Sequence, residues 1–293
     1  MKSTNAPGGA ALVLTLALAV SPITVPGAAN AHDAARSPAA RSTTSRRPAL
    51  VVDVQVGKHH ITRSRTGFRP GNTVFNVYFS PTRGHAAVQL VRLRQGYTFE
   101  DLRADLESGD LSAIRRIDRK AIFYGGMPAT HQTPSHFGVR LDPGTYWLFD
   151  ADTPRWVSLR VTGAPQRRTL PRTTGSIDMV MRHGEHRFAT PTSLPIQGWV
   201  KQTNRTDEPH FMDMTMVKPS TTRRQVRRAF NGQGGTGWII KDYPGTFVVS
   251  PGRSVVWRYA YPPGRYLELC FWPNAADGTS HAETGMWNFI TLR

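Results

Sequence analysis

The sequence predicts an all-β protein built from two tandem β-sandwiches, each interrupted by one short helical insertion. Two observations favour this fold class. Apolar and polar residues alternate in most segments, as in VFNVYF (74–79) and SVVWRYAY (254–261), and Pro-Gly and Asn or Asp turns separate these segments, which is typical of half-buried strands. In addition, the second half of the 293-residue chain repeats the framework of the first half.

The repeat shows most clearly when the two halves are aligned on their Pro-Gly-x-Tyr segments. Three residue pairs then coincide: His85 with His210, Tyr146 with Tyr266, and Asp150 with Cys270. A segment rich in Pro, Arg and Thr, APQRRTLPRTTG, lies between the halves. We therefore expect a degenerate first domain over residues 49–163, a linker over residues 164–176, and a second domain over residues 177–293.

Each half also contains one stretch with the start signal of a helix. Thr98 is followed three residues later by Asp101, and Thr222 is followed by Gln225. This is the spacing of a capping box, in which the two side chains satisfy main-chain N–H groups at the start of a helix. Too few apolar residues follow to build a helical core, so we expect both helices to be excursions between strands.

The first 31 residues have the layout of a secretory signal peptide. Lys2 precedes the apolar run Ala10 to Val20, and small residues end the stretch at Ala29-Asn30-Ala31, so we expect cleavage after Ala31. Residues 32–48 are rich in Ala, Arg, Ser and Thr and are expected to form a disordered leader. The mature protein is therefore expected to be secreted and extracytoplasmic.

The formal net charge of +17 is large for a chain of this length and comes mostly from arginine. Such a charge favours anionic partners. The arginines are scattered and no zinc-finger, helix-turn-helix or RNA-binding signature accompanies them, so no nucleic acid is expected. An anionic cell-wall or membrane surface suits an exported chain better.

Cys270 is the one cysteine of the chain and has no partner for an internal disulfide bond. It stands at the end of the predicted strand in PPGRYLELC, and the following loop carries His281 and Met286. His210 lies near the start of another strand. A thiolate, two imidazoles and a weak axial thioether form the ligand set expected for a copper ion that cycles between Cu(I) and Cu(II).

With these residues the second half resembles the cupredoxins, in particular the plastocyanin- and azurin-like blue copper proteins. In those proteins a first histidine follows an Asn-containing turn, often as Pro-His, and a Pro-Gly-x-Tyr-x-x-x-Cys strand leads into a Cys, His, Met loop. The matching positions here are Asn204, Pro209-His210, 263–270, His281 and Met286. The resemblance covers residues 177–293, and the first half shares only the framework.

The resemblance implies Greek-key sandwiches and one type 1 copper ion in the second half, with electron transfer as the usual activity. A redox or copper-donor protein would then be a partner. One feature departs from the family, which usually separates Cys from His by two to four residues, because ten residues separate Cys270 from His281. The turn residues Pro273-Asn274 and Asp277-Gly278 would allow this loop to fold back and still deliver His281.

Each proposed ligand also has a purely structural interpretation. Cys270 would be a small apolar residue in a strand, Met286 would be a core residue, and either histidine would bond to the main chain. The competing hypothesis is a metal-free secreted β-sandwich that binds anionic cell-envelope polymers through its basic surface.

Motifs for catalysis are absent from the sequence. It has no Gly-x-Ser-x-Gly or His-Glu-x-x-His motif, and no His-x-His pair of the kind that multicopper oxidases use for a three-copper cluster. The segment His183-Gly184-Glu185-His186 has a spacing that could chelate a metal ion, but it also fits a polar turn or edge strand, which we favour. We therefore expect a protein that is not an enzyme.

Overall fold

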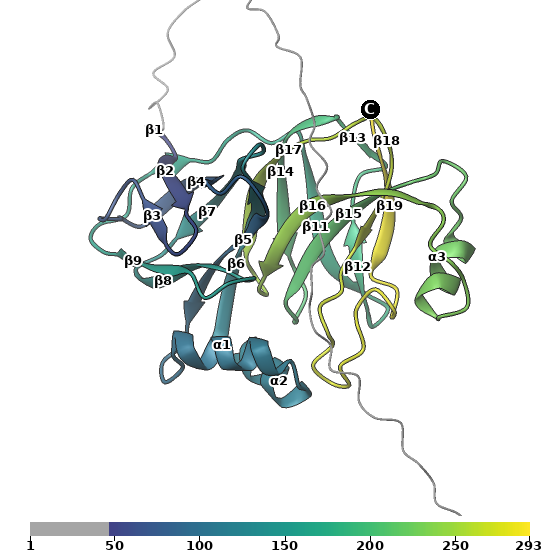
Figure 1. The fold of residues 1–293 in the computed structure, drawn as a ribbon, viewed down its shortest axis with the longest axis horizontal. Helices are drawn as coiled ribbons and strands as arrows, with labels where there is room; N and C mark the ends of the chain where they lie inside the picture. The colour runs from purple at the N-terminus through teal and green to yellow at the C-terminus, as the bar shows by residue number, and fades with distance from the viewer. Residues whose placement is uncertain (1–46) are drawn as a thin grey trace, which may run out of the picture.

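The computed structural model describes residues 47–293, which form two large β-sheets around a common apolar core (Figure 1). In spatial order, the eight-stranded sheet consists of β12 (Glu185–Ala189), β11 (Gly175–Arg182), β14 (Gln197–Asn204), β17 (Ser254–Ala260), β7 (Ser135–Leu141), β4 (Gly71–Phe79), β2 (Leu50–Val56) and β3 (Ile61–Arg63).

The nine-stranded sheet consists, in spatial order, of β13 (Ser193–Leu194), β19 (Trp287–Leu292), β18 (Gly264–Leu269), β15 (His210–Val217), β16 (Ile239–Val249), β6 (Ala121–Thr130), β5 (His85–Leu93), β8 (Gly144–Asp150) and β9 (Trp156–Val161). A further parallel pair joins β1 (Arg47–Pro48) to β10 (Arg168–Thr169). The second of these strands lies in the segment expected to be a linker.

Both sheets contain strands from each half of the chain, so the two halves share their sheets. In the eight-stranded sheet they meet where β17 pairs with β7, at Trp257 and Phe137. In the nine-stranded sheet they meet where β16 pairs with β6, at Val249 and Tyr124. One continuous core cluster includes residues from both halves.

The repeat is visible in a hydrogen bond that both halves make. The hydroxyl of Tyr146 donates to the carbonyl oxygen of Asp142 at 2.9 Å, and that of Tyr266 donates to the carbonyl oxygen of Pro262 at 2.8 Å. Both rings are completely buried, where a tyrosine hydroxyl needs a partner. The prediction of an all-β chain made of two sandwich halves is confirmed.

The helices begin where the capping boxes indicate, at α1 (Phe99–Ser108) and α3 (Arg223–Phe230). Thr98 with Asp101, and Thr222 with Gln225, form the reciprocal bonds of the box.

The expectation of one helix in each half is wrong for the first half, which has a second helix, α2 (Leu111–Lys120). Gly109 ends α1 in the left-handed conformation, with φ of 59°. Asp110 then caps the new helix by accepting a hydrogen bond from the N–H of Ala113.

The predicted signal peptide (1–31) and most of the predicted leader (32–48) lie outside the described residues. Among residues 47–293, no helix is long and apolar enough to cross a membrane.

Candidate metal centre

The four residues proposed from the sequence lie together at one end of the second half. His210 opens β15, and Cys270 directly follows the neighbouring strand β18. His281 and Met286 lie in the connection from β18 to β19. All four residues are 0 % exposed.

Three of their side-chain atoms form a compact triangle. The Nδ1 atoms of His210 and His281 are 2.9 Å apart, and the Sγ atom of Cys270 lies 3.7 Å from the first and 3.8 Å from the second. A point equidistant from the three atoms lies about 2 Å from each of them, close to the length of metal–nitrogen bonds and a little shorter than metal–thiolate bonds.

The outer nitrogen of His281 faces a carboxylate. Its Nε2 lies 2.7 Å from Oε2 of Glu208, which accepts a hydrogen bond. We therefore assign the proton of the neutral ring to Nε2, and the lone pair of Nδ1 points toward Cys270.

The outer nitrogen of His210 lies 2.8 Å from the hydroxyl of Thr206. This hydroxyl has one proton and also lies 2.8 Å from Oδ1 of Asn204 and 3.0 Å from the carbonyl oxygen of Glu208. We assign the hydroxyl proton to these oxygens, which can only accept, so that the hydroxyl faces His210 as an acceptor. In this assignment the lone pair of His210 Nδ1 is also directed inward, and two lone pairs face each other beside a thiol.

The long segment between Cys270 and His281 forms a closed hairpin. The N–H of His281 donates to the carbonyl oxygen of Trp272 at 3.0 Å, and Pro273 forms an isolated bridge with Ser280. At its base, therefore, only Phe271 separates Cys270 from Trp272, the partner of His281. The extra residues project outward as this hairpin, so the spacing does not separate the two side chains.

Met286 is joined to the same residues through its main chain. Its N–H donates to the carbonyl oxygen of His281 at 2.7 Å, and its carbonyl oxygen accepts from the N–H of Cys270 at 3.3 Å. The side chain is buried in the core.

A third histidine, His186 on β12, also reaches the site, which the sequence analysis did not anticipate. The ligand atoms of His186, His210 and His281 lie within 4.8 Å of one another. The ring centroids are 4.6 Å apart for His186–His210 and 4.7 Å for His186–His281, with planes inclined at 68° and 61°. Nε2 of His186 also lies 3.2 Å from Oδ1 of Asp207.

The sequence signal for His186 was the spacing of His183-Gly184-Glu185-His186. Gly184 and His183 turn the chain with φ of 79° and 53°, and β12 pairs with β11 as an edge strand. The edge-strand reading was correct. That interpretation did not reveal that β12 places His186 against the buried rings of His210 and His281.

In the metal-free protein, burial determines the protonation states of the site residues. It lowers the pKa of His210 well below its usual range, and the neighbouring histidines add to the effect. It also lowers the pKa of His281, against the opposing effect of Glu208. Burial raises the pKa of the Cys270 thiol to about 12. Neutral imidazoles are ready to bind a metal, whereas the thiol must lose its proton to do so.

This donor set suits copper. A thiolate and imidazoles match the preferences of both Cu(I) and Cu(II). A cation alone would be costly in so buried a place, and the thiolate charge offsets that cost. The residues present therefore fit a copper ion.

The corresponding position in the first half holds an ion pair. The carboxylate of Asp150 accepts from the N–H of Ala87 and the hydroxyl of Thr153, both at 2.8 Å, and from the guanidinium of Arg155. The side chains of Asp150 and Arg155 are 0 % and 7 % exposed. The guanidinium thus supplies the positive charge beside the residue aligned with Cys270.

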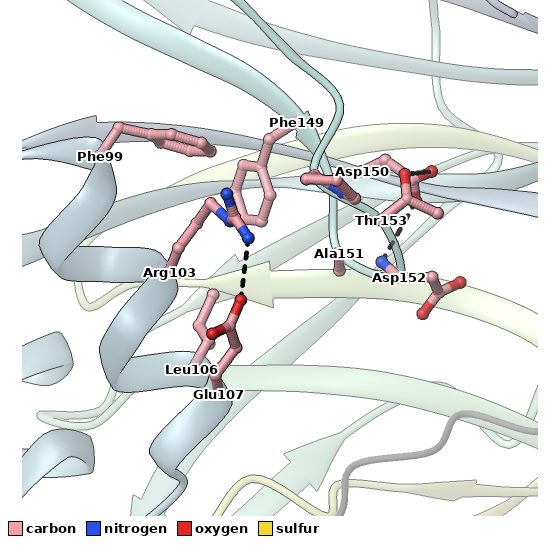
Figure 2. Close-up of a pocket in the computed structure, with 10 residues that line it drawn as sticks. Phe99, Arg103, Leu106, Glu107, Phe149, Asp150, Ala151, Asp152 and Thr153 are labelled. Atoms are coloured by element: carbon pink, nitrogen blue, oxygen red, sulfur yellow. Dashed lines mark hydrogen bonds and ion pairs between the residues drawn. The ribbon is translucent and has the colours of Figure 1, made fainter. Parts of the chain in front are cut away.

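A surface pocket next to this ion pair is lined by residues of α1 and of the turn after β8, including Phe99, Phe149 and Asp150 (Figure 2). Figure 2 shows the bond from Thr153 to Asp150 at its rim. His85, the counterpart of His210, pairs with Asp152 at 2.8 Å, which raises its pKa. Both candidate donors of the first half are therefore engaged with other residues.

No protein-family model matches the sequence, and no curated protein matches it. Solved structures do match. Reduced auracyanin from the photosynthetic bacterium Roseiflexus castenholzii is 19% identical, with 42% of this chain and 98% of that chain covered and a TM-score of 0.27.

Two further matches extend over both halves. Copper nitrite reductase from Nitrosomonas europaea is 8% identical, with 84% of this chain and 94% of that chain covered and a TM-score of 0.25. The multi-copper oxidase from Pediococcus acidilactici is 10% identical, with 84% of this chain and 59% of that chain covered and a TM-score of 0.25. These similarities concern the fold and assign no particular activity to this chain.

The prediction that the protein is not an enzyme is wrong. The similar structures include a multi-copper oxidase, a laccase and copper nitrite reductases, which are enzymes. One fold supports many functions, so missing sequence motifs were not sufficient grounds to exclude catalysis.

The sheet order shows two sandwich halves joined through both sheets. The chain therefore has a tandem β-sandwich fold, which is the arrangement that the resemblance of its sequence to the cupredoxins predicts.

Proposed function

We propose that the protein binds one copper ion in its second half, through His210, Cys270 and His281, for electron transfer or copper handling. The observation that carries this proposal is the buried triangle of donor atoms, in which the Nδ1 atoms of His210 and His281 lie 2.9 Å apart beside the thiol of Cys270, with their lone pairs assigned inward. Opposed lone pairs repel each other, and a bound cation would turn this repulsion into attraction.

A bound copper ion would supply a centre that accepts and releases one electron. The protein's part is to hold the donors in place while the charge changes. Glu208 and Thr206 fix the outer nitrogens of the two histidines, and such outer partners orient ligating rings. The complete burial of the three donors excludes water, so little rearrangement would accompany a change of oxidation state.

The fourth position of the site has two candidates. Met286 is the residue that the resemblance implies, and its main chain is bonded to Cys270 and His281. His186 is the residue that the histidine cluster favours. A thioether would favour Cu(I), whereas a third imidazole is a harder donor and would favour Cu(II).

Export is part of the proposal, since the signal-peptide pattern of residues 1–31 supports it. A mature chain outside the cytoplasm would meet its electron or copper partner there.

The test is copper uptake by the purified, reduced, full-length mature chain. We expect one copper ion per chain by elemental analysis and an intense thiolate-to-Cu(II) charge-transfer band in the visible spectrum. Cys270→Ser should lose the band, because a hydroxyl stays protonated and is a poor donor to copper. If reduced wild-type protein without disulfide dimers takes up no stoichiometric copper, the proposal fails.

A further inference from the structure

The hairpin between Cys270 and His281, residues 271–280, is held by the other half of the molecule. In Figure 1 the yellow loops of the second half descend toward α2. The guanidinium of Arg115 on α2 donates from Nε to the carbonyl oxygen of Ala275 at 2.6 Å and from Nη2 to that of Ala276 at 2.8 Å. One side chain therefore holds two consecutive carbonyl groups at the hairpin tip.

The base of the hairpin is held by the same helix and the strand after it. Nε1 of Trp272 donates to Oδ1 of Asp118 at 3.3 Å. Its ring packs edge-on against Phe123 of β6, with centroids 6.0 Å apart. Trp272 is 5 % exposed, so this contact is part of the core between the two halves.

Hydrogen bonds within the hairpin stabilise its shape, but they do not fix its orientation relative to the rest of the molecule. Asn274 and Gly278 close the tip, with the N–H of Gly278 donating to the carbonyl oxygen of Asn274 at 2.8 Å. Such bonds move with the hairpin as a unit. The contacts with Arg115, Asp118 and Phe123 tie it to the first half, while Phe271 at its start packs edge-on against Phe230 of α3, with centroids 6.0 Å apart.

Trp272 is hydrogen-bonded directly to His281, so a shift of Trp272 would also move His281. The carbonyl oxygen of Trp272 accepts from the N–H of His281 at 3.0 Å, and Trp272 is two residues from Cys270. A displacement of the hairpin base would therefore change the separation of the thiol from the His281 imidazole.

We infer that α2 of the first half positions the metal-binding loop of the second half, with Arg115 and Asp118 as positioning residues. The inference rests on the proposed copper site for its consequence and on the contacts above for its mechanism. It gives the first half a role even though its own counterpart of the site is filled by an ion pair. It also accounts for the long Cys–His segment, which extends far enough to reach α2.

The first experiment uses metal-free, full-length protein and does not depend on copper. Amide hydrogen exchange is compared between wild type, Arg115→Ala and Arg119→Ala. Arg119 is the matched control, since it is exposed on the same helix and its side chain makes no hydrogen bond within residues 47–293. We expect exchange in residues 274–281 to be about tenfold faster in Arg115→Ala, the size of effect of losing about one net hydrogen bond, and unchanged in Arg119→Ala. Equal exchange in all three proteins would overturn the inference.

The second experiment reads the metal site in the same variants loaded with copper. Arg115→Ala should broaden the copper hyperfine pattern in electron paramagnetic resonance and weaken the visible band, and Arg115→Lys, which keeps one donor, should restore part of both. Trp272→Phe keeps the ring against Phe123 and removes the N–H, so it should act in the same direction and serves if Arg115→Ala folds poorly. Spectra unchanged in both variants would refute a role in positioning. If wild type binds no copper but the exchange difference persists, the copper proposal fails while the hold on the hairpin stands.

Discussion

The Nδ1 atoms of His210 and His281 face each other at 2.9 Å, while the outer nitrogens of both rings are bonded to Thr206 and Glu208. Without a cation, the two inner lone pairs repel each other within a buried site. Burial lowers the pKa of both rings, so both are neutral, and in the assignment above each carries its one proton on the outer nitrogen. The metal-free fold therefore contains a local repulsion that a bound ion would remove.

This relationship predicts that copper stabilises the folded chain. A ligand that binds only the folded state stabilises it by about 2.7 kcal/mol at a free concentration one hundred times its Kd. Chemical unfolding of the full chain with and without Cu(I) should show this increase, and Cys270→Ser should show much less of it. Copper that leaves the unfolding midpoint of wild type unchanged would contradict the prediction.

The fourth ligand is predicted to be revealed by two matched substitutions. If Met286 is the axial donor, Met286→Leu should mainly shift the reduction potential, since a thioether bond to copper is long and weak. If His186 is the donor, His186→Gln should change the electron paramagnetic resonance pattern and lower copper affinity, while Met286→Leu should change little. Spectra and potentials of both variants distinguish the cases. If both variants behave like wild type, neither residue is a ligand.

The first half is predicted to bind no copper tightly. Its aligned carboxylate, Asp150, is fully used by Ala87, Thr153 and Arg155, and His85 pairs with Asp152. Full-length Cys270→Ser should therefore show neither a visible band nor tight uptake by calorimetry. A tight site that remains in that variant and is lost when His85→Ala is added would contradict the assignment, whereas a site that needs His210 belongs to the second half.

The same ion pair is predicted to be important for folding. Asp150→Ala leaves the buried guanidinium of Arg155 without its partner, which should cost about 3–5 kcal/mol of unfolding free energy. Arg103→Ala, which breaks the exposed pair with Glu107 shown in Figure 2, should cost about 0.3–0.5 kcal/mol. Urea unfolding measures both values. Similar small losses for the two variants would show that the Asp150–Arg155 pair contributes little.

Local signals in the sequence predicted local structure well. Thr98 and Thr222 begin helices because their partners lie three residues away, within reach of the same turn. The end of β18 at Leu269 follows from the alternation and places Cys270 beside the start of β15. The proximity of His210 and Cys270 could therefore be predicted from strand ends, and that of His281 from the turn residues of the following loop and the resemblance to cupredoxins.

Features that depend on distant pairing could not be predicted. His186 approaches His210 because the edge strand β12 lies at one end of the eight-stranded sheet, and no short-range pattern encodes this position. The hold of Arg115 on Ala275 depends on both halves sharing their sheets. The helix α2 was missed because Gly109 and Asp110 read equally well as a loop, whereas together they end one helix and cap the next.

Export is predicted to remove residues 1–31. N-terminal sequencing and intact mass of protein recovered outside the cell should show a start at or near His32, because the small residues at Ala29 and Ala31 suit the cleavage site. Membrane-embedded protein that retains Met1 would contradict this prediction.

The contribution of Asp118 to the stability of the metal-free protein is predicted to fall as pH rises from about 4 to about 7. Burial raises the pKa of this carboxyl to about 7, against the opposing hydrogen bond from Trp272. In the unfolded chain the pKa is about 3.9, so between these values the folded state holds a proton that the unfolded state has lost. The folded state is then progressively disfavoured as pH rises, and the loss is complete above the folded pKa.

Asp118→Asn tests this directly, because the amide oxygen can still accept from the indole of Trp272 while the titration is removed. A shift of about three pKa units corresponds to about 4 kcal/mol as an upper limit. The free energy of unfolding of the variant minus that of wild type should therefore be larger at pH 8 than at pH 4, by up to that limit. Urea unfolding of metal-free protein measures this difference. Asp110→Asn is a suitable control, since the hydrogen bonds of Asp110 at the start of α2 lower its pKa, and its contribution to stability is lost only as the pH falls. A difference between Asp118→Asn and wild type that is the same at pH 4 and pH 8 would show that Asp118 does not titrate between those values in the folded protein.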